Sequence, residues 1–186
     1  MPTWLWIVIA VAAAIVLGVV AYAAWRQSRT RRLKSTFGPE YERATTDAEK
    51  SEAEAELLER KKRHDELEIR PVSQGARERY LERWDAVQAQ FVDDPEGAVG
   101  EADNLIQEVM RERGYPVEDF DQRAADISVD HPDVVQHYRE GHAIATSNGE
   151  PGGDSRTEDL RQAMHHYRAL FDEVLVGDRE HEEVHQ

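Results

Sequence analysis

Hydrophobic and polar residues divide the chain into one apolar segment and a longer remainder with helical periodicity. Residues 4–25, WLWIVIAVAAAIVLGVVAYAAW, carry no charged side chain. At about 1.5 Å per residue these 22 residues form about 33 Å of helix, and the hydrocarbon core of a bilayer is about 30 Å thick. The pattern therefore predicts an N-terminal transmembrane helix that crosses a membrane once.

Beyond this segment, no stretch alternates with the period of a strand. Gly38-Pro39 is expected to end the first helix. Residues 44–70 are rich in Glu, Ala, Lys and Arg and have few apolar positions, which predicts a charged helical stalk or coiled-coil partner. The predicted fold is all-α, and the stalk leads to a small bundle of about four or five helices.

Capping residues mark the helix ends in the predicted bundle. Asp94-Pro95 predicts a helix start, and Gly114 is a natural residue just beyond a helix end. Asp130-His131-Pro132 predicts a second start by the same device. Asn148–Arg156 is turn-forming throughout and predicts a mobile loop before the last helix.

Helical spacing places apolar residues on one face of each predicted bundle helix. The clearest faces contain Tyr80, Leu81, Trp84, Val87 and Phe91; Val99, Ala102, Leu105, Ile106, Val109 and Met110; and Leu160, Ala163, Met164, Tyr167, Leu170, Phe171 and Val174. The first face, with its three aromatic rings, fits domain core better than an exposed groove for a partner helix.

The ends of the apolar segment predict its orientation. Trp4, Trp6, Tyr22 and Trp25 lie where aromatic rings favour the headgroup level. Five cations follow at once, namely Arg26, Arg29, Arg31, Arg32 and Lys34. Basic flanks stay cytoplasmic, so we expect a single-pass protein of the inner (cell) membrane with its N-terminus outside and its C-terminal domain in the cytoplasm.

A cleavable signal peptide is the alternative interpretation of the same segment. Ala21-Tyr22-Ala23 supplies a small-x-small cleavage site, and cleavage there would leave Ala24 as the mature N-terminus of an exported helical protein. The missing basic n-region and the length of the apolar run favour an anchor instead.

The net charge of the chain after the apolar segment limits the classes of partner that it can bind. All 38 acidic residues of the 186-residue chain lie at or after Glu40, so residues 36–186 hold 18 basic and 38 acidic groups, a formal charge of −20. Such a surface repels nucleic-acid phosphates. The chain also has no cysteine, which excludes a disulfide framework or a thiolate metal site.

These patterns predict five parts along the chain. They are a transmembrane anchor (1–25), a basic juxtamembrane flank and linker (26–43), a charged helical stalk (44–70), an acidic helical bundle (71–176) and a flexible tail (177–186).

Four short motifs in the chain are FGPEY (37–41), FVDDP (91–95), RGYP with Asp119-Phe120 (113–120) and SVDHP (128–132). Together they resemble a family of uncharacterised bacterial proteins that have an N-terminal hydrophobic segment and a helical domain. The resemblance covers roughly residues 37–174. It implies an architecture and a bacterial origin, and it assigns no activity and no site residue.

The tail contains a metalloprotease-like motif. His181-Glu182-Glu183-Val184-His185 matches H-E-x-x-H, in which two histidines on one helix face hold zinc and the glutamate acts as general base. That chemistry needs a formed helix and a third ligand, whereas this run follows Gly177-Asp178 in a charged tail. Adventitious metal binding is the simpler expectation.

Five further histidines lie in the last two predicted helices, namely His131, His137, His142, His165 and His166. His131, His137 and His142 are five or six residues apart, so they do not share a helix face. An interhelical pair of His142 with His165 or His166 would suit a metal, but core or capping roles are the ordinary interpretation.

Pairs of acidic residues also have two possible interpretations, a catalytic or metal-binding role and a structural role. Asp93-Asp94 and Asp119 with Asp121 lie beside helix starts, where capping explains them first. The chain has no Gly-rich phosphate loop, no G-x-S-x-G and no cysteine nucleophile, which disfavours an enzyme. We therefore assign no catalytic, cofactor-binding or metal residue.

The sequence as a whole favours a membrane-tethered helical adaptor or scaffold. Its expected partners are a membrane and another protein, with a homodimer as a second option and nucleic acid excluded. The alternatives are a metal-binding protein or metal-dependent hydrolase that uses the His-rich segments, and the exported helical protein described above.

Overall fold

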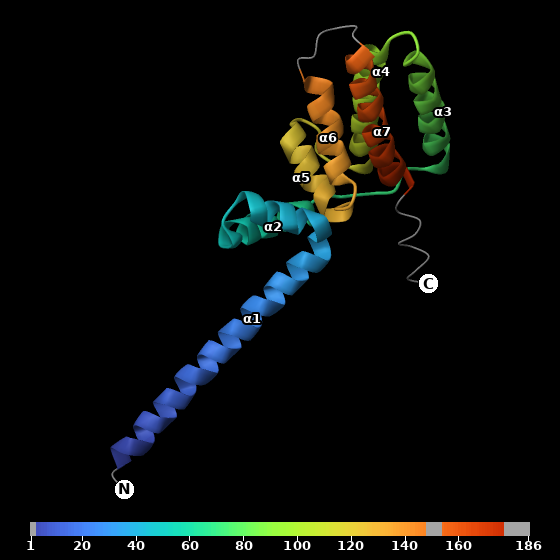
Figure 1. The fold of residues 1–186 in the computed structure, drawn as a ribbon. Coiled ribbons are helices and arrows are strands. Elements are labelled where there is room, and N and C mark those ends of the chain that lie inside the picture. Colours follow the sequence, from blue (N-terminus) through green and yellow to red (C-terminus); the bar gives the residue numbers. More distant parts are fainter. Residues whose placement is uncertain (1–2, 148–153, 177–186) are drawn as a thin grey trace. The chain divides into compact units, whose positions relative to one another are not determined.

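The computed structural model of the chain describes residues 3–147 and 154–176, with the side chains of these residues except those at 3, 5, 7–11, 154, 155 and 176. Over this part of the chain there are seven helices and no strand, which confirms the predicted all-α class (Figure 1). Two compact units comprise residues 1–57 and 58–186.

The first unit contains a long helix with one sharp break. Helix α1 runs over Thr3–Asp47, and inside it Gly38 has φ 45° and ψ −123°. That backbone conformation is open to glycine and strained for other residues, and Pro39 follows it. The predicted Gly-Pro break is therefore present as a kink, after which the chain continues as helix to Asp47.

A buried carboxylate ties three segments of this unit together. Glu54 lies in α2 (Lys50–His64), a helix that crosses the unit boundary. One oxygen, Glu54 Oε1, accepts hydrogen bonds from Thr30 Oγ1 at 2.7 Å and from Tyr41 Oη at 2.9 Å. Thr30 precedes the kink and Tyr41 follows it, so this single acceptor helps to set the bend.

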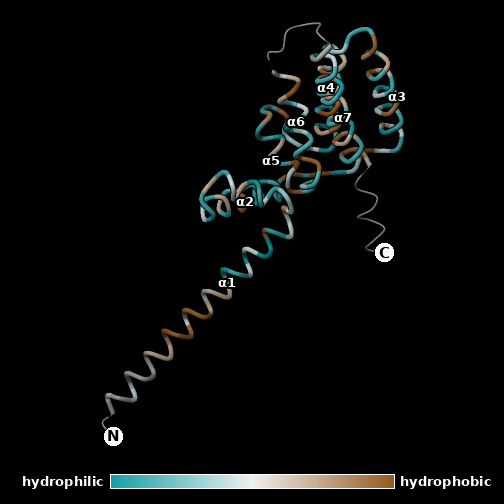
Figure 2. The backbone as a smooth tube through the Cα atoms, in the orientation of Figure 1, coloured by the Kyte–Doolittle hydropathy of each residue, from teal (hydrophilic) through white to brown (hydrophobic). Residues whose placement is uncertain are grey.

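The apolar end of α1 is exposed on all sides where its side chains are described. Consecutive large residues between 15 and 20 are each about 60% exposed, for example Ile15 at 62% and Leu17 at 68%. Figure 2 shows hydrophobic residues along this helix, followed by hydrophilic ones. In the part of the chain open to description, no helix is long and apolar enough to span a membrane. Residues 5 and 7–11 of the predicted span lie outside the described side chains.

The second unit is a helical bundle. Its helices are α3 (Gln74–Gln90), α4 (Pro95–Arg113), α5 (Phe120–Asp130), α6 (Val135–Thr146) and α7 (Asp154–Val176). Helix α7 packs along α6 and α4, α3 packs on α4, and α5 lies against α6 (Figure 1).

The core of the bundle is built from the predicted apolar faces. Trp84 of α3 is fully buried, and its ring stacks on that of Phe171 of α7 with 4.6 Å between centroids. All six predicted core residues of α4 and all seven of α7 are buried, while Leu81 and Phe91 are partly buried against them. The aromatic face of α3 is therefore core and not an open groove.

Two predicted helix boundaries differ from the structure. The helix expected over residues 44–70 is interrupted at Ala48-Glu49 and ends at His64. Beyond it, Leu67 and Ile69 pack against the core of the bundle, so the last part of the predicted stalk belongs to the second unit.

The predicted start at Asp130-His131-Pro132 is wrong. Asp130 is the last residue of α5, and α6 begins at Val135 after Val134, which makes no side-chain capping bond. The physical reason is that the Asp130 carboxylate already accepts hydrogen bonds from His64 and Tyr115.

One glycine sets the distance between α6 and α7. A Cβ atom built on Gly141 would lie 3.0 Å from two ring carbons of Tyr167 and 3.2 Å from Cβ of His166. Tyr167 is buried and therefore has little room to move. A larger residue at position 141 would force the two helices apart.

We expect Gly141→Ala to destabilise the protein. Gly100, in α4, is the matched control, because a Cβ there has nothing within 4 Å and Gly100→Ala gains about 0.5–1 kcal/mol of helix propensity. Crowding of a buried ring costs about 1–3 kcal/mol, so Gly141→Ala should be at least about 1 kcal/mol less stable than Gly100→Ala. Thermal unfolding of the full chain in detergent measures this; equal stabilities would contradict the close approach.

Candidate functional site

Three metal-ligating side chains lie together where α6 faces α7. His137 and Glu140 are three residues apart on α6, and His166 comes from α7. The two Nδ1 atoms are 3.0 Å apart, and Glu140 Oε2 lies 3.4 Å from Nδ1 of His166 and 4.0 Å from Nδ1 of His137. Burial lowers the pKa of His166; Glu140 opposes this effect and His137 adds to it.

The histidine pair predicted from the sequence is not the one that forms. His142 turns toward α5, where its ring stacks on Phe120 at 3.6 Å between centroids. His165 is exposed, and its Nε2 lies 2.9 Å from Arg161. His142 therefore pairs with neither predicted partner. His166 instead contacts His137, which lies about one and a half turns before His142 on α6.

His131 follows the last residue of α5, four residues before α6 begins, and lies among charged groups. It is buried, with Nε2 at 3.4 Å from Nη1 of Arg113 and Nδ1 at 3.1 Å from Oε1 of Glu173. Burial and the nearby Arg113 charge lower the pKa of His131, against the opposing effect of Glu173 and Asp130. His131 therefore has the surroundings of a core histidine. Its neighbour Arg113 has a structural role too, because it donates to the Val174 carbonyl in the last turn of α7.

The neighbouring carboxylate of Asp130 is held by two donors. His64 Nε2 lies 2.7 Å from Asp130 Oδ2, and the Tyr115 hydroxyl donates to the same oxygen. Burial alone would raise the pKa of Asp130, but these two hydrogen bonds together with the charges of His64 and His131 lower it.

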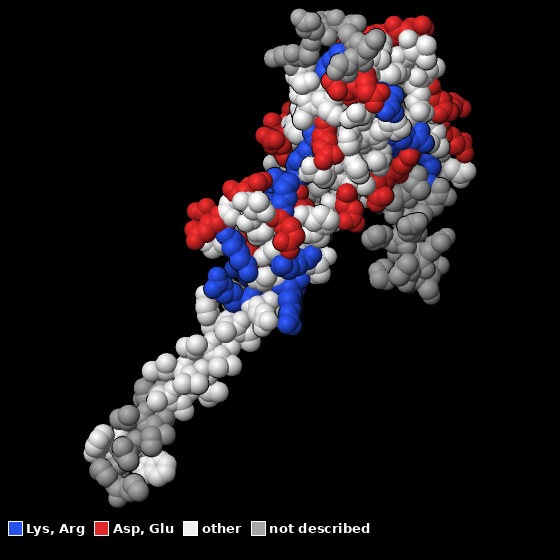
Figure 3. Space-filling model, in the orientation of Figure 1, with Lys and Arg blue, Asp and Glu red and all other residues white. Residues whose placement is uncertain are grey.

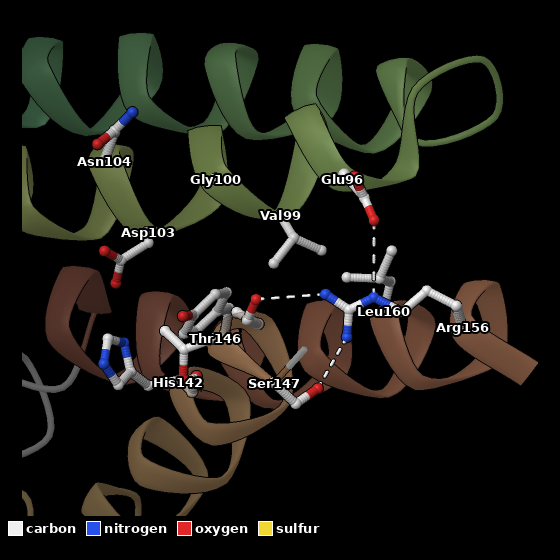
Figure 4. Close-up of a pocket in the computed structure, with 12 residues that line it drawn as sticks. Glu96, Val99, Gly100, Asp103, Asn104, His142, Thr146, Ser147, Arg156 and Leu160 are labelled. Atoms are coloured by element: carbon white, nitrogen blue, oxygen red, sulfur yellow. Dashed lines mark hydrogen bonds and ion pairs between the residues drawn. The ribbon is translucent and has the colours of Figure 1, made fainter. Parts of the chain in front are cut away.

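A cleft of about 520 Å³ lies between α4, α6 and α7 (Figure 4). Asp103 and His142 line one part of it, and Glu96 and Arg156 line another. The Tyr138 hydroxyl lies 3.4 Å from Oδ1 of Asp103 and also accepts a hydrogen bond from Arg123 Nε at 2.9 Å. The cleft is thus bordered by side chains that already bind one another.

Arg156 is part of the framework of this cleft. Its Nη1 donates to the Ile144 carbonyl and to Ser147 Oγ, both at 2.9 Å, which satisfies acceptors at the C-terminal end of α6. Figure 4 shows the guanidinium directed toward Ser147 and Glu96, the latter at 3.7 Å from Nε. These contacts of Arg156 fix the end of α6, so its guanidinium is already engaged within the protein.

One residue of each acidic pair, Asp94 and Asp119, has the expected capping role. Asp94 Oδ1 accepts from the Gly97 amide at 3.0 Å, and Asp119 Oδ2 accepts from the Gln122 amide at 2.9 Å. Each carboxylate therefore starts a helix, α4 or α5.

Two sequence features cannot be placed. The tail motif His181–His185 and most of the predicted loop, residues 148–153, lie outside the described residues. Glu140 is the site residue that sequence reasoning missed. The sequence feature that could have identified Glu140 is its three-residue spacing from His137, which puts both side chains on one helix face.

In comparisons with known proteins, no protein family, no curated protein and no solved structure matches the chain. The family resemblance drawn from the four short motifs therefore has no further support, and the candidate site is interpreted from its own geometry.

We expect His131 to make the protein less stable as the pH falls below about 6.5. Its pKa is lowered in the folded state, so the unfolded chain binds the proton first, and the free energy of unfolding decreases with decreasing pH over that window. One such group contributes at most about 1.4 kcal/mol per pH unit. Chemical unfolding at pH 7 and pH 5 should show a smaller loss for His131→Gln than for the parent.

His165→Gln is the control for this measurement, because His165 is exposed and lies outside the charged cluster. If both variants lose as much stability as the parent between pH 7 and pH 5, His131 does not carry the effect.

Proposed function

We propose that the protein is a non-enzymatic, membrane-tethered helical adaptor or scaffold. The observation that carries this proposal is the apolar end of α1, whose described large side chains are exposed in every direction. A helix that is hydrophobic all round is stable only in an apolar environment, and a bilayer supplies one. The uncharged run of residues 4–25 has the length for a single span.

The charges that follow support an orientation with the C-terminal unit in the cytoplasm. Five cations lie between residues 26 and 34, and Figure 3 shows blue side chains gathered next to the uncharged part of α1. Basic residues beside a span are retained on the cytoplasmic side of the inner membrane. The remainder of the first unit then connects the anchor to the bundle.

The bundle supplies the surface that an adaptor needs. Its hydrophobic faces are used in its own core, and acidic side chains are spread over the face seen in Figure 3. With a formal charge of −20 over residues 36–186, this surface favours a protein partner with a basic patch. The described histidines and carboxylates take part in packing, caps and ion pairs, which fits binding better than catalysis.

We expect a reporter that works only in the cytoplasm to be active when it is fused after residue 186. We also expect the full chain to stay in the membrane fraction after alkaline extraction, whereas removal of residues 4–25 should release the protein. Neutral replacement of the five cations at 26–34 should weaken the orientation preference. Periplasmic activity of the C-terminal fusion would overturn the orientation, and an intact mass that begins at Ala24 would establish the exported alternative.

We expect crosslinking in intact cells to join the bundle to a protein partner that an anchor-only chain does not capture. Because the proposed surface is acidic, capture from solubilised membranes should fall as ionic strength rises from about 0.05 M to 0.5 M. Equal recovery with the anchor-only chain would count against the adaptor, and recovery of only the same chain would indicate a homodimer.

A further inference from the structure

The cluster of His137, Glu140 and His166 brings three possible metal-ligand atoms to the separations that a bound zinc ion requires. A tetrahedral zinc ion with bonds of about 2.0–2.1 Å holds its ligand atoms about 3.3–3.4 Å from one another. The three ligand-atom separations here are 3.0, 3.4 and 4.0 Å, so they scatter around that edge length. Small side-chain rotations would equalise them.

The backbone supports this arrangement. His137 and Glu140 project from one face of α6 because they are three residues apart. Gly141 lets that helix approach α7 so closely that an added Cβ would meet both Tyr167 and Cβ of His166. The residue that brings the two helices together therefore lies beside two of the three ligands.

A neighbouring side chain orients the carboxylate. Gln136 Nε2 donates to Glu140 Oε1 at 2.9 Å, while Oε2 is the oxygen that faces the histidines. A hydrogen bond of this kind holds a ligating carboxylate in one direction. Gln136 is accordingly a positioning residue.

We propose that His137, Glu140 and His166 bind one zinc ion between α6 and α7, with water in the fourth position. Both imidazoles bind through Nδ1 as neutral rings that carry their proton on Nε2, and Glu140 binds through Oε2 as a carboxylate. Half-exposed His137 and Glu140 leave a path from solvent, with 46% and 44% of their side chains accessible. The mixed nitrogen and oxygen ligands favour zinc over Mg²⁺ or Ca²⁺, which prefer oxygen alone.

The competing interpretation is a metal-free cluster. One Nδ1–H donates to the other Nδ1, and Glu140 forms an ion pair with a protonated ring. This interpretation predicts no zinc-dependent property for the three residues, so zinc binding separates the two.

The test uses the full chain, purified in detergent without an affinity tag, with His181→Gln and His185→Gln to remove the tail motif as a competing site. We expect this parent to bind one zinc ion per chain. His166→Gln and Glu140→Gln should each weaken zinc binding at least about tenfold, and Gln136→Ala by about tenfold, as loss of an orienting partner does. His165→Gln is the matched control and should leave the affinity unchanged.

Two readouts distinguish loss of the site from loss of the fold. Zinc should raise the Tm of the parent and of His165→Gln but not that of His166→Gln, because a ligand stabilises only the state that binds it. The metal-free variants should retain the helical signal of the parent; Glu140→Gln changes a half-exposed side chain and serves if His166→Gln unfolds. Mg²⁺ and Ca²⁺ should have no effect on Tm.

The proposal is overturned if the parent binds no zinc at micromolar concentration, or if His166→Gln and Glu140→Gln bind it as tightly as His165→Gln. It is independent of the adaptor function, because neither membrane placement nor a partner protein enters the measurement.

Discussion

The apolar face of α7 is the surface on which the second unit is assembled. Leu170 and Phe171 are fully buried, and the same helix packs along both α4 and α6. Through the stacked rings of Phe171 and Trp84 it also reaches α3. Burying a large apolar side chain contributes about 1.5–3 kcal/mol, so the six large side chains on this face together contribute more than any polar contact in the unit. The positions of α6, of the cleft and of the histidine cluster all follow from this packing.

Polar contacts then decide how the ends of the helices are arranged. Arg113 donates to the last turn of α7, Arg156 donates to the last turn of α6, and Asp130 accepts from His64 and Tyr115. Arg113 and Arg156 are buried, so their contacts satisfy groups whose burial without a partner would be costly. The charged residues described in this acidic chain are therefore of two kinds, since some fix the framework of the helices and others remain at the surface.

Much of the bundle could be predicted from local patterns. The 3.6-residue period identified Trp84, Leu105 and Phe171 as core, and the Asp94 cap marked the start of α4 to the residue. These features succeed because a cap or an amphipathic face depends on neighbours within a few residues in the chain. Asp130 shows the limit of the method. Its sequence context matches a cap, but its partners His64 and Tyr115 are 66 and 15 residues away.

The sequence by itself determined the helical class, the apolar faces, the uncharged run at residues 4–25 and the separation of basic flank from acidic domain, because each is a property of composition or of spacing along one helix. Only the tertiary structure decided which histidines meet. His137 and His166 are 29 residues apart, and their contact depends on the rotation and spacing of α6 against α7, which Gly141 and the buried ring of Tyr167 set. A helix pattern shows which side chains share a face, but packing against a second helix determines which side chains come within bonding distance.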